Sequence, residues 1–244
     1  MNAIVVTGTD TDIGKTVFAA ALVGAMNAQA ASQERLPGEG RGPVASAPIL
    51  GPGLRRGSVE EARGAYYWKP VQAGLDDGSD RERVARLSGL PEENLLPEAY
   101  RLLTPCSPHR AAQIDGVTID PARLALPQVD GPLVIEGAGG ALVPLNDALL
   151  YADMFARWNA PTVIVARTTL GTINHGLLTV EALRSRNVPI LGIAFIGDAV
   201  EDSEATICRI GKVRRLGRLP RLDPLTPDTL AAAFAANFSL ADFA

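Results

Sequence analysis

Residues 3–16 read Ala-Ile-Val-Val-Thr-Gly-Thr-Asp-Thr-Asp-Ile-Gly-Lys-Thr, and an alanine-rich stretch follows. The apolar, β-branched start predicts a buried strand, and the alanine-rich stretch predicts a helix. A glycine-containing loop between a strand and a helix, ending in Gly-Lys-Thr, is typical of a phosphate-binding loop. In such a loop Lys15 binds the outer phosphates and the Thr16 hydroxyl binds Mg²⁺. These residues therefore predict a site for a nucleoside triphosphate.

The loop departs from the commonest pattern in ways that narrow its class. Its first glycine, Gly8, stands one residue earlier than usual, and Thr9 takes the usual position. ATPases of the partitioning type carry a second lysine early in this loop, where this chain has Asp10. A carboxylate cannot bind phosphate as a lysine does. Asp10 and Asp12 instead favour a cation nearby, either Mg²⁺ or a substrate that carries an amine.

Apolar runs and helix-like segments alternate along the chain. This order predicts a P-loop NTPase-type α/β fold in which a parallel sheet is covered by helices on both faces. Ligands of such sheets bind beyond the carboxyl ends of the strands. We expect strands at 3–7, 66–71, 132–136, 162–166 and 190–196, and helices at 15–28, 79–88, 148–159, 174–186, 202–211 and 226–236.

Length and composition fit one α/β domain of ordinary size, which we expect in the cytoplasm. The chain has 244 residues and a net charge of −4, which argues against nucleic acid or an anionic membrane as partner. No apolar run approaches the ~20 residues that span a bilayer. Residues 1–20 lack the basic start of a signal peptide. Cys106 and Cys208 have no metal-ligand spacing, so we expect two free thiols.

Residues 29–64 interrupt the alternation. They contain seven glycines, four prolines and no aromatic residue, a composition typical of disordered chain. A connection between a helix and the next strand needs only a few residues. We therefore predict a single domain over 1–244 with a disordered insertion at 29–64. The insertion is either a surface segment without function or an arm for regulation or partner binding.

Charged residues stand at the ends of two further expected strands. Lys69 lies near the end of the strand at 66–71, either as a second cation for a transferred phosphoryl group or as an exposed edge lysine. Glu136 ends the strand at 132–136 before a glycine-rich turn, and suits a magnesium ligand. Asp80 is a candidate for another ligand or a helix N-terminal acid. The residues Leu170–His175 also follow a strand, and form either an anion-binding helix N-terminus or an ordinary cap.

In this order the motifs resemble those of dethiobiotin synthetase, an enzyme family of biotin synthesis. The resemblance covers about residues 1–28 and 66–225, and leaves 29–64 outside. The motifs are Gly8–Thr16, Lys69-Pro70-Val71, Ser107-Pro108-His109, Glu136–Gly140 and Leu170-Gly171-x-Ile173-Asn174-His175.

The resemblance implies a ligase, a cyclo-ligase that forms C–N bonds, with ATP as co-substrate and Mg²⁺ as cofactor. The other substrates are 7,8-diaminononanoate and CO₂ or bicarbonate. One amine becomes a carbamate, the carbamate takes the γ-phosphoryl group of ATP as a carbamic–phosphoric anhydride, and the second amine closes the ring of dethiobiotin. ADP and phosphate are released. A homodimer is implied, because in this family the neighbouring subunit supplies the segment that binds the substrate carboxylate.

The resemblance also implies the site residues. The catalytic residues are Lys15 and Lys69, and the magnesium ligands are Thr16, Asp80 and Glu136. The ATP-binding residues are Thr11, Asp12, Ile13, Gly14, Lys15, Thr16, Asp80, Glu136, Gly137, Ala138, Gly139, Gly197, Leu219, Pro220 and Arg221. The substrate-binding residues are Asp10, Lys69, Ala73, Gly171, Thr172, Ile173 and Asn174.

This chain departs from the family at two of these positions. Ala73 stands where the family has Ser or Thr, which removes a hydrogen bond to substrate worth about 0.5–1.5 kcal/mol, and Gln72 is placed to compensate. Residues 196–198 read Ile-Gly-Asp where the family often has an asparagine that reads adenine. The base preference therefore does not follow from the resemblance.

Two other classes stay open at this point. One is a nucleotide switch of the partitioning ATPase type, which Asp10 disfavours. The other is a P-loop amidoligase of corrin synthesis, which carries a separate glutaminase domain with a catalytic cysteine. This chain is too short for that domain, and neither cysteine lies in a nucleophile motif. ATP turnover that depends on the diamine separates the three classes.

Overall fold

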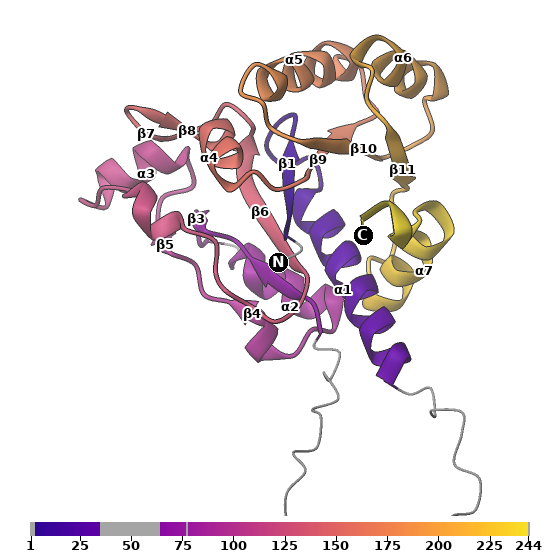
Figure 1. The fold of residues 1–244 in the computed structure, drawn as a ribbon, viewed down its shortest axis with the longest axis horizontal. Helices are drawn as coiled ribbons and strands as arrows, with labels where there is room; N and C mark the ends of the chain where they lie inside the picture. Colours follow the sequence, from indigo (N-terminus) through magenta and orange to yellow (C-terminus); the bar gives the residue numbers. More distant parts are fainter. Residues whose placement is uncertain (1–2, 35–63, 77, 244) are drawn as a thin grey trace, which may run out of the picture.

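A computed structural model describes residues 3–34, 64–76 and 78–243 (Figure 1). The strands are β1 (Ala3–Gly8), β2 (Tyr66–Trp68), β3 (Val71–Ala73), β4 (Leu95–Leu96), β5 (Tyr100–Leu102), β6 (Leu133–Gly140), β7 (Pro144–Asn146), β8 (Leu149–Leu150), β9 (Thr162–Arg167), β10 (Ile190–Ile196) and β11 (Arg215–Leu219). The helices are α1 (Lys15–Glu34), α2 (Asp80–Ser88), α3 (Pro108–Ile114), α4 (Tyr151–Trp158), α5 (Thr172–Arg184), α6 (Glu201–Gly211) and α7 (Pro227–Asn237), with 3₁₀ turns at Glu92–Asn94, Pro121–Leu124 and Leu240–Phe243.

Seven parallel strands form the central sheet, in the order β11-β10-β9-β1-β6-β2-β4. The first strand of the chain therefore lies at the middle of the sheet, between β6 and β9. Because parallel strands end at the same edge, the loops after β1, β2 and β6 meet at one place. The fold class predicted from the sequence is confirmed.

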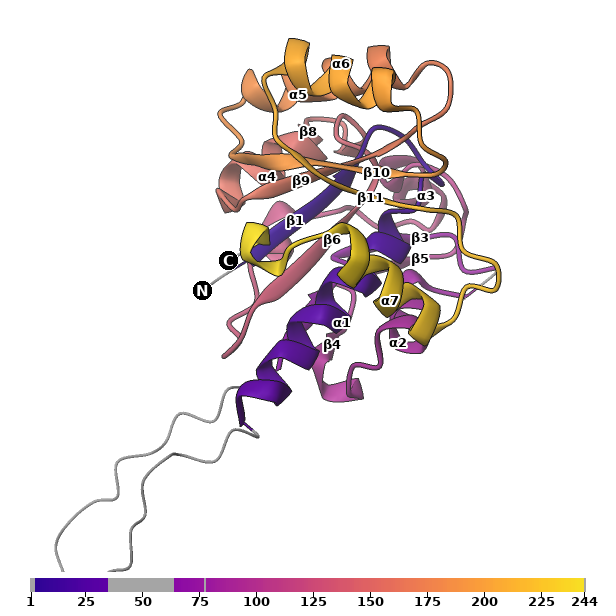
Figure 2. The ribbon, with the colours of Figure 1, turned by 90° about the vertical axis from the view of Figure 1, so that its right-hand side faces the viewer.

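Helices cover both faces of this sheet, as the edge-on view in Figure 2 shows. On one face α1, α2 and α7 pack on the sheet, with Phe18 of α1 and Phe234 of α7 buried there. On the other face α4, α5 and α6 enclose a second core that contains Phe155 and Leu183. Successive side chains of β1 point to opposite faces of the sheet, so they belong alternately to the two cores. Burial on both faces explains why the central strands read as continuous apolar runs.

Several element boundaries differ from those expected. The strand predicted at 66–71 is two strands, because Pro70 lies between them and cannot donate a backbone hydrogen bond. After it the chain enters a small sheet of β3 and β5. The edge strand β11 was not predicted, since the arginines in Arg215–Leu219 hide its strand character. The short helix α3 was not predicted either.

The predicted start of the insertion, residue 29, was wrong. Residues 29–34 continue α1, which runs from Lys15 to Glu34 without a break. Alanine and glutamine are strong helix formers, and they carry the helix past residue 28. The rest of the predicted insertion, residues 35–63, lies outside the described residues. Cys106 and Cys208 are free, as expected.

Candidate active site

The loop after β1 is shaped by two glycines. A Cβ atom at Gly8 would lie 2.6 Å from the Cδ1 atom of Ile13 and 2.9 Å from the Cδ atom of Lys15, so a larger residue there would displace both side chains. Gly14 has φ of 95°, which disfavours any other residue, and Ile196 at the end of β10 packs beside it. The early position of the first glycine therefore leaves room for the side chains of Ile13 and Lys15. Lys15 bends over the loop, and its Nζ donates to the carbonyl of Asp10 at 2.7 Å.

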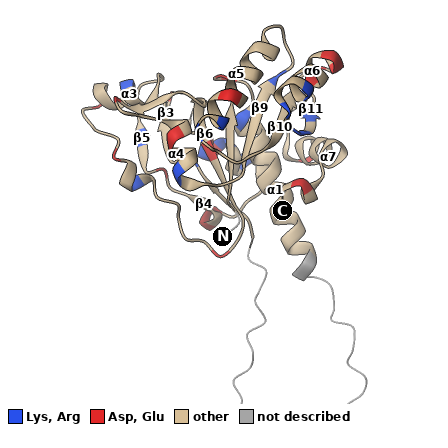
Figure 3. Ribbon diagram, turned by 45° about the horizontal axis from the view of Figure 1, so that its top comes forward, with Lys and Arg blue, Asp and Glu red and all other residues tan. Residues whose placement is uncertain are grey.

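Three oxygen atoms from distant parts of the chain meet beside this loop. The Oγ1 atom of Thr16 lies 3.0 Å from Oδ1 of Asp80 and 2.7 Å from Oε1 of Glu136. Glu136 is fully buried in the middle of β6, which continues to Gly140 beyond the end expected at residue 136, and only groups brought by the fold can balance its charge there. The three predicted magnesium ligands thus lie together, as the shared strand edge required. In Figure 3 acidic and basic positions accordingly adjoin near β6 in the middle of the fold.

Lys69 supplies the balancing charge. Its Nζ atom lies 2.6 Å from Oδ2 of Asp80 and 3.1 Å from Oε1 of Glu136, and it donates to the carbonyl of Gly137. Only 4% of the residue is exposed, so the interpretation as an exposed edge lysine is wrong. Burial alone would lower the pKa of Lys69, but the carboxylates of Glu136 and Asp80 outweigh it and hold the pKa above its usual range.

The two lysines of the site differ in their protonation behaviour. Burial, followed by the neighbouring charge of Lys69, lowers the pKa of Lys15 to about 8. Burial would raise the pKa of Asp80, yet the charge of Lys69 and hydrogen bonds from Lys69 and Thr16 lower it below the ordinary value. At neutral pH both lysines are therefore mainly protonated, and the carboxyl group of Asp80 is ionised.

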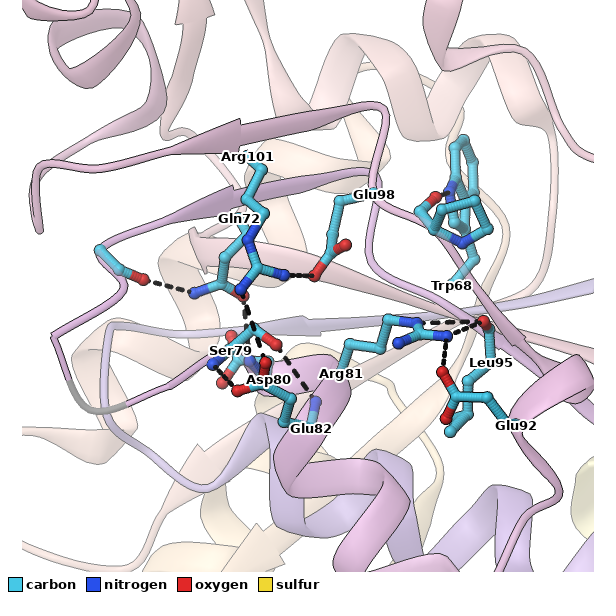
Figure 4. A network of polar contacts seen from close by, with 12 residues as sticks. Trp68, Gln72, Ser79, Asp80, Arg81, Glu82, Glu92, Leu95, Glu98 and Arg101 are labelled. Carbon is cyan, nitrogen blue, oxygen red and sulfur yellow. Dashed lines mark hydrogen bonds and ion pairs between the residues drawn. The ribbon is translucent and has the colours of Figure 1, made fainter.

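Asp80 is fixed by the start of α2 (Figure 4). Ser79 is the N-cap of that helix and forms a capping box with Glu82, so the first turn is rigid. The backbone N–H of Asp80 donates to Oε1 of Gln72 at 3.1 Å, and Nε2 of Gln72 donates to the carbonyl of Gly74. Asp80 is thus a helix N-terminal acid and a member of the charged cluster at once. Through these two hydrogen bonds Gln72 connects β3 to Asp80 at the start of α2 and to the backbone at Gly74.

A cavity of about 960 Å³ opens over this cluster. Its wall includes most of the predicted nucleotide-side residues, and also Ser107 and Pro108 of the third motif. The predicted site residues on the wall are Thr11, Asp12, Ile13, Gly14, Lys15, Thr16, Lys69, Ala73, Asp80, Glu136, Ala138 and Gly139. The predicted site residues outside it are Asp10, Gly137, Gly171, Thr172, Ile173, Asn174, Gly197, Leu219, Pro220 and Arg221.

The segment predicted to bind the substrate carboxylate does not reach this cavity. Gly171, with φ of 95°, is the N-cap of α5, and the Thr172 hydroxyl donates to the carbonyl of Arg167. The side chain of Leu170 is fully exposed, and Asn174 is exposed as well. Within one chain this segment is a solvent-facing helix start.

The predicted ATP-binding residues Gly197, Leu219, Pro220 and Arg221 lie at the ends of β10 and β11 or directly after them. The N–H of Gly197 donates to the carbonyl of Leu219 at 3.0 Å, and Nη1 of Arg218 donates to the carbonyl of Gly197 at 3.2 Å. Arg221 is exposed and its Nε lies 4.0 Å from a carboxylate oxygen of Asp198. Because Ile196 packs on Gly14, this region adjoins the phosphate-binding loop although it does not line the cavity.

Sequence reasoning missed three residues of the site. The hydroxyl of Tyr67, buried in β2, donates to Oε2 of Glu136 at 2.7 Å. Arg83 and Arg86 of α2 lie on the cavity wall. A signal for Tyr67 existed, because a tyrosine in a buried strand needs a partner for its hydroxyl. The arginines are three and six residues beyond Asp80, on the helix face that it shares.

The sheet and the loop after β1 place this chain in the P-loop NTPase fold class. Residues 55–229 match a family model described as an AAA domain. A ParA family ATPase from Chlorobium tepidum TLS shares the fold, with a TM-score of 0.50 and 8% identity over 96% of this chain and 91% of that one. At this identity the likeness concerns the fold alone.

Closer relatives give the family. An ATP-dependent dethiobiotin synthetase BioD of Novosphingobium aromaticivorans is 58% identical over 244 residues, which is 100% of both chains. One of Rhodopseudomonas palustris (strain HaA2) is 58% identical over 98% of this chain and 95% of its own. One of Rhizorhabdus wittichii is 59% identical over 99% and 98%. The chain belongs to the ATP-dependent dethiobiotin synthetase family.

Proposed function

We propose that this chain is a ligase that converts 7,8-diaminononanoate and CO₂ to dethiobiotin, with ATP consumed and ADP and phosphate released. Family membership supports the reaction, since it extends over the whole chain at 58% identity. The observation that carries the proposal from the structure is one cavity in which Lys15, Lys69 and the three oxygen ligands meet. Phosphoryl transfer depends on positioning and charge neutralisation, and these residues supply both.

The reaction balances in two displacements. One amine of the substrate adds to CO₂ and loses a proton, which gives a carbamate. A carbamate oxygen attacks the γ-phosphorus of ATP, the bond to the bridging oxygen breaks, and ADP leaves. The second amine then attacks the carbamate carbon of the mixed anhydride, phosphate leaves and takes up the proton that the amine loses, and the cyclic urea closes. Both displacements create negative charge on oxygen, which favours fixed cations at the site.

Lys15 and Lys69 act as these cations. The pKa of Lys69 is held above its ordinary range, so this lysine stays protonated and binds anionic oxygen; it does not accept the proton of an attacking amine. Lys15 lies on the phosphate-binding loop, and it needs only to release the carbonyl of Asp10 to meet a phosphate. The acidic residues Asp10 and Asp12 on the same loop favour the diamine or a metal ion nearby.

The oxygen cluster fits a magnesium ion. Ligands at about 2.1 Å in an octahedron lie about 3.0 Å from one another, and Oγ1 of Thr16 lies 2.7 and 3.0 Å from its two carboxylate neighbours. Among the described residues no group of three His, Cys, Asp or Glu side chains could hold a metal. On the geometry of their oxygen atoms, Thr16, Asp80 and Glu136 would hold Mg²⁺ together with phosphate oxygens. When bound, Mg²⁺ neutralises charge on the transferring phosphoryl group.

A homodimer completes the proposal. The carboxylate of the substrate needs a partner, and residues 171–174 lie outside the cavity of their own chain. We assign that segment to the cavity of a second copy. No helix in the described part of the chain is long and apolar enough to cross a membrane. We propose that the enzyme works in the cytoplasm without nucleic acid or membrane partners.

Phosphate release from Mg-ATP tests the function directly. We expect release to require both 7,8-diaminononanoate and bicarbonate, and to produce one dethiobiotin, identified by mass, for each phosphate. Phosphate release that does not depend on the diamine would contradict the proposal. The nucleotide switch of the partitioning ATPase type would then be the favoured function.

A further inference from the structure

Glu136 is held by two different sets of groups, one at each oxygen. Its Oε1 atom lies 2.7 Å from Oγ1 of Thr16 and 3.1 Å from Nζ of Lys69. Its Oε2 atom accepts from the hydroxyl of Tyr67 at 2.7 Å. The carboxylate therefore presents one oxygen to the other groups of the site and commits the second to the tyrosine.

Tyr67 cannot easily give up this bond. The residue is fully buried, and its ring packs in the core between α1 and the sheet. β2 pairs directly with β6, with Tyr67 opposite Val134, so the ring lies in the strand next to the one that carries Glu136. If Oε2 turned away, the hydroxyl would stay buried without a partner, which is costly. The hydrogen bond thus fixes the rotation of the carboxylate.

We propose that Tyr67 sets the cation selectivity of the site by leaving Glu136 a single oxygen for metal binding. Mg²⁺ prefers a small octahedral site, in which each carboxylate supplies one oxygen. Ca²⁺ takes six to eight oxygen ligands and often binds both oxygens of a carboxylate. Blocking Oε2 withholds from Ca²⁺ a ligand that Mg²⁺ does not need. Tyr67 is a positioning residue in this scheme, because it acts through Glu136. The inference rests on the proposed magnesium role of Thr16, Asp80 and Glu136.

The variant Tyr67→Phe tests it, since the ring stays and only the hydroxyl is lost. Binding of Mg²⁺ and of Ca²⁺ is measured by isothermal titration to the full chain with a non-hydrolysable ATP analogue. We expect the ratio of the Ca²⁺ dissociation constant to the Mg²⁺ dissociation constant to fall by about fivefold or more, the size of one hydrogen bond. Tyr66→Phe is the matched control, because the side chain of Tyr66 packs against the core of the opposite sheet face. Its ratio should stay at the wild-type value.

An unchanged ratio in Tyr67→Phe, or an equal weakening of both cations, would overturn the proposal. Wild-type phosphate release is measured in parallel, so a failure of the proposed reaction is seen separately from a failure of selectivity.

Should Tyr67→Phe not fold, judged by circular dichroism, infrared difference spectra of the wild-type protein with and without Mg²⁺ give the answer. Glu136→Gln assigns the carboxylate bands. A separation of the two carboxylate stretches wider than in the metal-free protein indicates binding through one oxygen and supports the proposal. A narrower separation indicates binding through two oxygens and contradicts it.

Discussion

The two regions proposed to bind the two ends of the substrate differ strongly in their exposure to solvent. Beside the loop after β1, Lys69 is 4% exposed and Glu136 of β6 is fully buried, and the two charges are paired. At the start of α5, Leu170, Gly171 and Asn174 are exposed, whereas Thr172 is buried. This contrast fits the proposal that the phosphoryl-transfer site is built within one chain and that the exposed start of α5 serves a second copy.

Removing the central cation should have the largest effect. We expect Lys69→Ala to lower diamine-dependent phosphate release by about 10²–10³-fold or more, because the developing negative charge loses its fixed donor. ATP binding should persist, since Lys15 and the backbone of the loop remain. Steady-state kinetics and equilibrium binding of ATP measure the two effects. The control is Lys212→Ala, an exposed lysine beyond α6.

If Lys69→Ala kept near-normal turnover, the role assigned to this lysine would be lost. If it also lost ATP binding, the effect would be structural, because it leaves Asp80 and Glu136 without a counter-charge.

The exposed region is tested next. We expect Asn174→Ala to raise the KM for 7,8-diaminononanoate about tenfold or more, the size of a hydrogen bond to a charged group, with the KM for ATP unchanged. Mixing this variant with Lys69→Ala should recover about a quarter of wild-type activity at low diamine. Half of the randomly formed dimers are hybrids, and each hybrid has one intact site.

Each variant measured alone is the control for the mixture. No recovery, in dimers shown by mass spectrometry to have exchanged subunits, would mean that the segment does not serve the cavity of a neighbour.

A smaller change is expected at Ala73, on the wall of the cavity. Ala73→Ser restores the hydroxyl that the family usually has there. We expect the KM for the diamine to fall about two- to tenfold, corresponding to one net hydrogen bond of about 0.5–1.5 kcal/mol. Ala99→Ser, at a half-buried position away from the cavity, is the control. An unchanged KM would indicate that Gln72 already serves this part of the substrate, or that the substrate does not approach Ala73.

Much of the buried region could be predicted from the sequence, for a geometric reason. The sequence placed Lys69 and Glu136 near the ends of expected strands, and parallel strands bring their carboxyl ends to one edge, although β6 runs on to Gly140. The phosphate-binding loop that begins at Gly8 identifies the edge of the sheet at which the site is expected. The distance along the chain between Thr16 and Glu136 therefore did not matter. Asp80 was harder, because an acid at a helix start has an ordinary explanation, and only the fold shows that this helix points at the cluster.

Other features depend on neighbours that a pattern of single residues does not show. In the sequence Tyr67 is one more aromatic residue in an apolar strand. Its role depends on the hydrogen bond from its hydroxyl to Glu136 on the adjacent strand, which only the fold shows. The edge strand β11 was missed because Arg215 and Arg218 look like surface residues. Both pair with Glu204, a carboxylate that is only 2% exposed in α6. Charge pairing across elements thus concealed both a strand and a buried acid.

The smallest effect is expected at the ion pair between Asp153 and Arg186, which connects α4 to the chain after α5. Oδ1 of Asp153 in α4 pairs at 2.8 Å with Nε of Arg186, which follows α5, and Oδ2 accepts from the N–H of Leu150. Burial would raise the pKa of Asp153, but the bond from Leu150 and then the charge of Arg186 outweigh it and lower the pKa. The folded-state pKa is thus below that of the unfolded chain, about 3.9. The stabilisation is present above about pH 4 and is lost as the pH falls through the folded-state pKa.

We therefore expect Asp153→Asn to lower the free energy of unfolding at pH 7 by about 0.5–1.5 kcal/mol. The difference from wild type should shrink as the pH is lowered from about 5 toward 3, because both proteins then carry a neutral side chain at this position. Urea unfolding at a series of pH values measures it. The KM for the diamine should change less than about twofold, since one ion pair among the contacts of α5 is lost and the helix start stays capped by Gly171. A difference that persisted at low pH would show that packing, and not charge, makes Asp153 important. A KM that rose as much as in Asn174→Ala would show that the exposed region depends on this one attachment.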